Sequence, residues 1–276
     1  MKRSKAFSGV YVALMLLFLY LPIFVLIAFS FNASKGYSWT GFSLKWYQDL
    51  FSNELLLTSF RNTLIVAVIA SIISTVLGTT AALGVFSMKN KTVKSAIKNV
   101  TTLPLLSPEI VMCISMMLLF SFVRSISGGG NSPNMVLGFI QLVIAHVTFC
   151  VPTVFLSVLP KLRQINSNMY EAALDLGCHP ARAFFKVIVP EIMPGIITGF
   201  LMAFTYSLDD FVISYFTNGN VQTLPITIYS LVKKRVSPEI NALSTILFVI
   251  VLLVLLIVNV RSIRAERAKE KKMMRL

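Results

Sequence analysis

The chain has 276 residues, of which 56% are hydrophobic and only 13% are charged, and its mean hydropathy is +0.78. A soluble domain carries about a quarter charged residues, so this composition excludes that class and predicts an all-α integral membrane protein. The formal net charge of +14 does not indicate a nucleic-acid partner, because the basic residues stand in short segments between apolar runs and form no basic face.

Six apolar runs have about the 20 residues that a helix needs to cross a bilayer, and together they form one transmembrane domain over residues 1–276. The first run follows the basic residues Lys2, Arg3 and Lys5. At about 22 residues it is longer than the apolar core of a cleavable signal peptide, so it is expected to be retained. The predicted spans are residues 9–31, 62–86, 105–124, 135–159, 194–217 and 240–260.

The Lys and Arg residues are distributed unequally between the two sides of these spans. Of the 25 Lys and Arg residues, 18 lie in the N-terminus, in residues 87–98, in residues 160–190 and in the tail 261–276. Because the cytoplasmic side of membrane proteins carries the excess, both termini and the polar segment at residues 165–190 are predicted to be cytoplasmic. The basic tail is suited to lie on anionic lipid.

On the predicted outer side, the aromatic residues Trp39, Trp46 and Tyr47 are typical of interfacial anchors, with a ligand site as the alternative. The glycine-rich residues 127–133 lack the Lys-Ser/Thr pair of a phosphate-binding loop. The basic residues 233–235 are either a docking surface for an acidic partner or a solvated run of charge.

Two Ser-Pro-Glu sequences are typical of helix starts, with a Ser N-cap, a first-turn proline and a carboxylate favoured at the positive helix end. They place Glu109 at the start of the third span and Glu239 at the start of the sixth, and ligand binding is the alternative for both. Pro104 and Pro108 together predict that the third span begins as a broken helix.

His146, in the fourth span, has no second His or Glu at metal-ligand spacing, so it is expected to form hydrogen bonds between helices. Cys113, Cys150 and Cys178 do not follow the pattern of a disulfide framework, and free thiols are expected. No metal site and no cofactor is predicted within this chain.

The fifth span contains the adjacent carboxylates Asp209 and Asp210, which are costly in an apolar run and normally face a cavity or a bundle interior. They predict a cation-attracting substrate pathway, in which Tyr206 and Tyr215 offer ring faces to the cation. The alternative is that one carboxylate caps a broken helix or pairs with a basic residue of a partner. Neighbouring helical residues point about 100° apart, so only one of the two is expected to face a lumen.

A polar, helix-forming segment connects the fourth and fifth spans. Glu171 and Asp175 are four residues apart and share one helix face, with Ala172 and Ala173 beside them. Small residues beside a charged face favour close approach to another molecule.

The same segment carries strong signals for a turn. Gly177 suits a helix stop and Pro180 suits the first turn of the next helix, while Pro190 is expected to end that helix or kink its exit. The prediction is a helix-turn-helix that contacts a partner. The chain contains no G-x-x-x-x-G-K-[ST] sequence, so it cannot itself be an ATPase.

The spacing of this segment resembles the EAA motif of permease subunits in binding-protein-dependent ABC importers, which is Glu-Ala-Ala, three residues, Gly, nine residues and then Ile-x-Leu-Pro. The matching residues are Glu171, Ala172, Ala173, Gly177 and Pro190. Val187 and Val189 stand where the family has Ile and Leu, which is a conservative difference.

Other stretches resemble the PotC-type permease subunits of spermidine/putrescine importers. They are Ser30-Phe31-Asn32, Ser107-Pro108-Glu109-Ile110-Val111-Met112, His146 to Pro152, Ser207-Leu208-Asp209-Asp210, Leu224-Pro225 with Ile228-Tyr229-Ser230, and Ser237 to Leu243. This resemblance implies a type I ABC importer permease fold (MetI-like) with six transmembrane helices, which moves polyamines into the cytoplasm by alternating access.

The resemblance also implies partners. The chain would stand beside a PotB-like second permease, two PotA-like ATPase subunits and an external PotD-like solute-binding protein, in the lipid bilayer of a bacterial cell membrane. It would be non-catalytic, with ATP and Mg²⁺ bound by the ATPase subunits. Its ATPase-coupling residues would be Glu171, Ala172, Ala173, Asp175, Gly177 and Pro190, and Glu171 would pair with a basic residue of the ATPase.

The sequence leaves three alternatives open. Importers of ferric iron, thiamine or sulfate share the EAA motif, so the solute could differ, and spermidine is not distinguished from putrescine. A stand-alone secondary transporter that uses Asp209 or Asp210 is disfavoured because the spans show no clear inverted halves. A membrane scaffold subunit would bind a cytoplasmic protein without transport.

Overall fold

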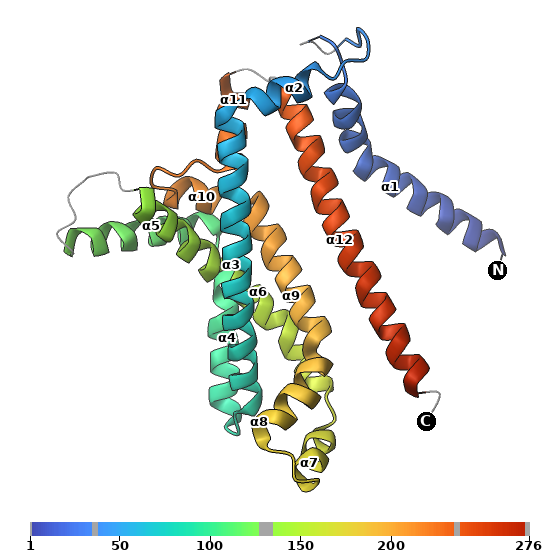
Figure 1. Ribbon diagram of the computed structural model, residues 1–276, viewed down its shortest axis with the longest axis vertical. Helices are drawn as coiled ribbons and strands as arrows, with labels where there is room; N and C mark the ends of the chain where they lie inside the picture. The colour runs from blue at the N-terminus through green and yellow to red at the C-terminus, as the bar shows by residue number, and fades with distance from the viewer. Residues whose placement is uncertain (1, 35–37, 127–134, 235–237, 274–276) are drawn as a thin grey trace. The chain divides into compact units, whose positions relative to one another are not determined.

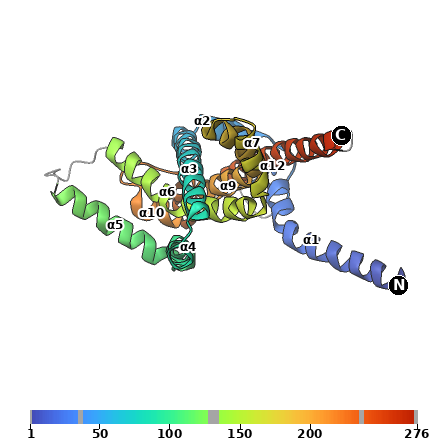
Figure 2. The ribbon, with the colours of Figure 1, turned by 90° about the horizontal axis from the view of Figure 1, so that it is seen from below.

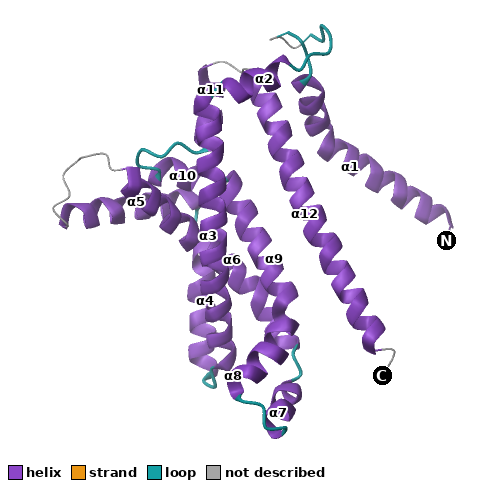
Figure 3. Cartoon of the chain, viewed as in Figure 1, coloured by secondary structure: helices purple, strands orange, loops and turns teal. Residues whose placement is uncertain are grey.

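The computed structural model describes residues 2–34, 38–126, 135–234 and 238–273, and over these residues every regular element is a helix (Figure 1, Figure 3). The helices are α1 (Lys2–Ser30), α2 (Lys45–Ser52), α3 (Glu54–Ser87), α4 (Lys91–Leu106), α5 (Glu109–Ile126), α6 (Met135–Gln164), α7 (Ser167–Asp175), α8 (Pro180–Ala183), the π-helix η1 (Phe184–Ile188), α9 (Val189–Asp209), α10 (Val212–Thr217), α11 (Leu224–Lys234) and α12 (Pro238–Met273). The predicted all-α fold is confirmed.

Among the described residues, six helical stretches are long and apolar enough to cross a membrane, as predicted. They are Gly9–Ser30, Glu54–Ser87, Glu109–Ile126, Val136–Gln164, Pro180–Asp209 and Glu239–Ile257. The fifth differs most from its predicted bounds of 194–217, because its helix already begins at Pro180, directly after the turn at Gly177, and stops at Asp209. The predictions for residues 127–133, Arg235 and Ser237 concern positions outside the described residues, and the side chains of the tail 261–276 are likewise not described.

The chain divides into two compact units, one formed by Thr58–Thr227 and the other by Met1–Leu57 with Ile228–Leu276. In the first unit α6 packs along α9. Gly195 and Gly199 of α9 face α6 so closely that a Cβ atom at Gly199 would lie 3.1 Å from Val154 Cγ1. Small residues allow two helix backbones this approach where lipid supplies no hydrophobic driving force. The buried core of the unit lies around Val154, Phe155 and Val158 on α6.

The break that Pro104 and Pro108 predict in the third span is present, since α4 ends at Leu106 and α5 begins at Glu109. Figure 2 shows α5 leaving the end of α4 as a separate rod. The expected capping role of Ser107 is wrong: its hydroxyl donates to the Leu103 carbonyl at 2.9 Å, so it closes α4 instead of capping α5. The proline following it removes the N–H that would continue the helix.

In the second unit the described residues between α1 and α2, 31–34 and 38–44, fold around Asn32. Its side-chain amide donates to the Ser38 carbonyl at 2.8 Å and accepts from the Thr40 N–H at 2.9 Å. The Trp46 indole N–H donates to the Asn32 carbonyl at 2.6 Å, and only 2% of the Trp46 surface is exposed. The prediction of an interfacial anchor is therefore wrong for Trp46, because its N–H has a buried protein acceptor, whereas Trp39 is exposed as an anchor should be.

Candidate functional site

The polar segment, residues 165–190, begins with α7 and turns sharply at Gly177. Asn166 caps α7 by accepting from the Asn168 N–H at 3.1 Å. Gly177 has φ +81°, a left-handed conformation that glycine adopts without a Cβ penalty. Its N–H donates to the Leu174 carbonyl at 2.8 Å, and the next N–H, of Cys178, donates to the Ala173 carbonyl at 3.1 Å. This pair of bonds closes the helix end, and the predicted stop at Gly177 is confirmed.

The helix after the turn starts at Pro180 and continues without interruption to Asp209. His179 caps it, with Nδ1 accepting from the Ala181 N–H at 3.4 Å. Of the two alternatives predicted for Pro190, that it ends this helix or kinks its exit, the first is wrong. Just before the proline, the helix adopts a π-turn, in which the Val189 N–H donates to the Phe184 carbonyl five residues earlier. The wider turn accommodates a residue that cannot donate the usual hydrogen bond.

Most of the predicted partner-contact residues of the polar segment lie on its surface. Glu171, Ala172, Asp175, Gly177 and Pro190 are exposed, and Ala173 is half-buried.

Leu176, which was not among the predicted contact residues, is 88% exposed at the tip of the turn. A single exposed Leu is unremarkable by itself, but this one adjoins Gly177 on a segment that is otherwise polar. An apolar residue within a polar run was the sequence feature that could have identified Leu176 as a contact residue.

The second group of candidate residues lies where α9 ends. Asp209 is the last residue of α9 and is exposed, whereas Asp210 is extended (φ −65°, ψ 118°) and only 8% exposed. The Asp210 carboxylate accepts from the Ser214 N–H at 2.8 Å and from the Ile213 N–H at 3.4 Å, so it caps the first turn of α10. The predicted single helix through residue 217 is therefore broken here, and the two carboxylates point into different surroundings.

His146 of α6 connects the two sides of this break. Its Nδ1 lies 2.7 Å from the Ser207 hydroxyl on α9, and its Nε2 lies 3.1 Å from the Ser214 hydroxyl on α10. The same Nε2 is 3.7 Å from Oδ2 of Asp210. The predicted interhelical role of His146 is confirmed, since this one buried ring bonds two helices that meet at Asp210.

A third carboxylate joins the pair, and we call Glu109, Asp209 and Asp210 the acidic cluster. Glu109 begins α5 and interacts electrostatically with both Asp210 and Asp209. Helix start and ligand binding were the two alternatives for Glu109; the structure places it at the start of α5, and ligand binding stays a prediction. Glu109 and Asp209 are 100 residues apart in the chain, so no local sequence pattern could have predicted that they lie close together.

The two tyrosines predicted beside the carboxylates flank the helix break. Tyr206 is 39% exposed on α9 and packs edge-on against Phe149, with ring centroids 6.4 Å apart. Tyr215 is 51% exposed on α10 and contacts Phe211, with centroids 5.4 Å apart. Both rings are held by aromatic neighbours and keep exposed surface, as a cation–π contact requires.

Comparisons with known proteins agree with this architecture. Residues 74–265 match the family described as the binding-protein-dependent transport system inner membrane component. The spermidine/putrescine transport system permease protein PotC of Haemophilus influenzae is 38% identical over 235 residues, which cover 84% of this chain and 87% of that protein. The putrescine transport system permease protein PotI of Escherichia coli K12 is 36% identical over 232 residues, which cover 83% and 81%.

Among solved structures, a bacterial alginate ABC transporter in complex with an alginate pentasaccharide-bound periplasmic protein has the same fold. Its similar chain superposes with a TM-score of 0.70 at 17% sequence identity, and 93% of each chain is covered. At this identity the likeness concerns the fold alone. The expected MetI-like permease fold is thereby confirmed.

Proposed function

The chain belongs to the family of binding-protein-dependent transport system inner membrane components, and we propose that it carries polyamines such as spermidine and putrescine across the membrane. It is a multi-pass protein of the bacterial inner membrane and a permease subunit of an ABC importer. Permease subunits do not hydrolyse ATP themselves. Partner ATPase subunits therefore bind ATP and Mg²⁺, and an external solute-binding protein delivers the solute.

The more specific assembly contains a PotB-like second permease, two PotA-like ATPase subunits and a PotD-like binding protein. The polar segment is its contact with an ATPase subunit on the cytoplasmic side. Leu176 and the small Ala172 give this surface an apolar tip, and Asp175 adds charge beside it. Specific protein–protein interfaces usually have an apolar anchor surrounded by polar residues.

The observation that carries this proposal is the uninterrupted helical run Pro180–Asp209. One end of this run follows the exposed turn at Gly177, and the other end is the exposed carboxylate of Asp209. A continuous helix transmits displacement along its axis, so movement of the ATPase reaches the acidic cluster through this run. The π-turn at residues 184–188 is the one place where the hydrogen-bond register of this run changes, and we assign bending to it.

Within the acidic cluster, Asp209 and Asp210 have different tasks. Asp209 is exposed at the C-terminal end of α9, where the helix dipole adds negative potential, and it receives an ammonium group of the polyamine. Asp210 is turned inward and fixes α10 against α9 together with His146. The exposed rings of Tyr206 and Tyr215 accept the aliphatic chain and its charged ends.

Co-purification tests the ATPase contact. The tagged chain is expressed with its ATPase and isolated in mild detergent, and the ATPase is quantified per permease. Leu176→Asp and Gly177→Asp should each lower this ratio severalfold, because one charges the apolar tip and the other forces an L-residue into a left-handed turn. Leu252→Ser, an exposed position on α12, serves as the matched control and should retain the ATPase.

The competing functions predict different results. Proton-dependent polyamine uptake by the purified chain alone in liposomes would contradict an ATP-driven importer and favour a secondary transporter. Retention of the ATPase without any polyamine uptake by the complete assembly would favour a scaffold subunit or another solute.

A further inference from the structure

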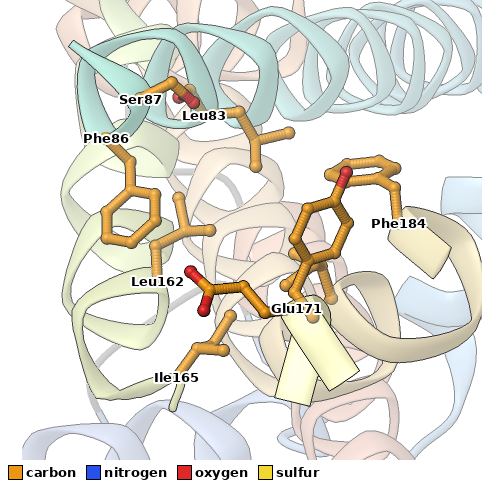
Figure 4. A pocket seen from close by; sticks show the side chains of 9 residues that line it. Leu83, Phe86, Ser87, Leu162, Ile165, Glu171 and Phe184 are labelled. Carbon is orange, nitrogen blue, oxygen red and sulfur yellow. Dashed lines mark hydrogen bonds between the residues drawn. The ribbon is translucent and has the colours of Figure 1, made fainter. Parts of the chain in front are cut away.

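A cavity of about 260 Å³ lies between the polar segment and the ends of two spans (Figure 4). Its walls come from α3, from the end of α6, from α7 and from the stretch that contains the π-turn. The lining residues are Leu83, Phe86, Ser87, Leu162, Ile165, Tyr170, Glu171, Phe184 and Ile188. The cavity is therefore bounded on one side by the segment that we assign to the ATPase contact and on the other by the spans.

The walls combine apolar surface with one carboxylate. Aliphatic side chains and the rings of Phe86, Tyr170 and Phe184 supply most of the lining. Figure 4 shows the Glu171 carboxylate extending into this space toward Leu162 and Phe86. A carboxylate among aromatic rings selects a cation with an apolar body, because the rings attract positive charge over their faces and the aliphatic walls contact the apolar body.

Helix ends add to the negative potential of the cavity. Ser87 is the last residue of α3, and Ile165 directly follows the end of α6, so two helix C-termini border the cavity. The C-terminal end of a helix carries partial negative charge. An ammonium group is in fact found beside one of these ends: Lys94 Nζ donates to the Phe86 carbonyl at 2.9 Å and lies 5.4 Å from the Phe86 ring centroid.

We propose that this cavity binds an amphipathic primary ammonium compound and that its occupation hinders movement of the polar segment relative to the spans. The ammonium group bonds the Glu171 carboxylate, and the aliphatic body lies among Phe86, Leu162 and Phe184. Because the ligand touches α3, α6 and α7 at once, it joins elements that must shift against one another when the π-turn bends. Bound ligand therefore slows transport.

The proposal rests on the proposed function in one respect, since that function puts a natural ligand on this side of the membrane. A polyamine carries primary ammonium groups on an aliphatic chain, and import raises its concentration in the cytoplasm. The cavity would then lower the import rate as the product accumulates. An ammonium lipid headgroup has the same recognition chemistry, and the experiment separates these two sources.

Binding is measured first, on the purified chain in detergent, by isothermal titration calorimetry. The probes are n-hexylammonium, 1,4-diaminobutane and neutral 1-hexanol. We expect n-hexylammonium to bind, 1-hexanol to bind at least about tenfold more weakly, and Glu171→Gln to weaken n-hexylammonium about tenfold. Ser87→Trp should abolish binding by filling the cavity.

Gly84→Ala is the matched control on the same helix, because its Cβ atom meets nothing within 4 Å. It should bind n-hexylammonium like the wild type. Equal binding of 1-hexanol and n-hexylammonium, or unchanged binding by Glu171→Gln with a wild-type melting temperature, would overturn the cation site. Binding of n-hexylammonium without 1,4-diaminobutane would overturn product inhibition and assign the cavity to a monoamine such as a lipid headgroup.

Transport is measured second, with the complete importer in proteoliposomes and each amine added on the ATPase side. For every variant the uptake rate with amine is divided by its own rate without amine. We expect 1,4-diaminobutane to lower this ratio severalfold in the wild type and Gly84→Ala, and to leave it near one in Ser87→Trp. An equal ratio in all three would refute the inference while leaving the proposed function intact, whereas absence of ATP-driven uptake would refute the proposed function itself.

Discussion

Asp210→Ala is expected to destabilise the protein, whereas Asp209→Ala is expected to leave its stability almost unchanged. The Asp210 carboxylate accepts two backbone N–H groups of α10, at 2.8 Å and 3.4 Å, and is only 8% exposed. Removing a helix N-cap costs about 1–2 kcal/mol, and a buried N–H left without an acceptor costs about 1–3 kcal/mol. We therefore expect a loss of about 2 kcal/mol in the free energy of unfolding.

The exposed Asp209 makes no such cap, and an exposed substitution of this kind changes stability by about 0.5 kcal/mol or less. For a chain of this size, about 2 kcal/mol corresponds to a fall of about 4–8 °C in melting temperature. Asp210→Asn should melt between the wild type and Asp210→Ala, because its amide oxygen still accepts one N–H group.

The melting temperatures can be measured through two native buried thiols. Cys113 and Cys150 are free and buried, with 1% and 0% of their surfaces exposed. A thiol-reactive fluorophore added to the detergent-purified chain therefore reports unfolding as these side chains become accessible. Equal melting temperatures for Asp210→Ala and Asp209→Ala would refute the capping role of Asp210 and the division of tasks within the acidic cluster.

Three further predictions follow from single positions. Asp209→Asn should lower polyamine uptake about tenfold or more with an unchanged melting temperature and unchanged ATPase retention, and wild-type uptake would remove Asp209 from the pathway. Leu176→Ser should reduce the ATPase recovered in co-purification severalfold, and full recovery would show that the apolar tip is not a contact. Gly199→Ala should lower the free energy of unfolding by about 1–3 kcal/mol, because its Cβ atom would overpack against Val154. Gly84→Ala should leave the free energy of unfolding unchanged or raise it by roughly 0.5–1 kcal/mol. Equal melting temperatures for the two variants would contradict the close packing of α6 and α9.

Local signals in the sequence predicted the features that depend on neighbouring residues. Long apolar runs gave six spans, because a bilayer demands about 20 apolar residues per helix. The turn at Gly177 was predictable because a left-handed helix end needs glycine. The spacing of residues 171–190 also indicated the family, because all residues of this motif lie within one short stretch of the chain.

Features that depend on distant residues were missed or predicted wrongly. The helix break capped by Asp210 was predicted only as an alternative, and the sequence did not show that His146 of another helix lies beside Asp210 or that Glu109 of a third helix approaches it. Trp46 was expected at the membrane interface, but the buried carbonyl of Asn32 satisfies its indole N–H. The π-turn before Pro190 likewise has no sequence signature, because proline is compatible with a helix end, a kink or a wider turn.

The most direct test of the central claim is uptake of radiolabelled spermidine and putrescine by the complete importer in proteoliposomes, with ATP present or absent on the ATPase side. The wild type should accumulate polyamine only with ATP and binding protein, and Gly177→Asp should abolish accumulation while the spans remain folded by melting temperature. Accumulation by the Gly177→Asp assembly at the wild-type rate, or uptake that is independent of ATP, would contradict transmission of ATP-driven movement through the polar segment.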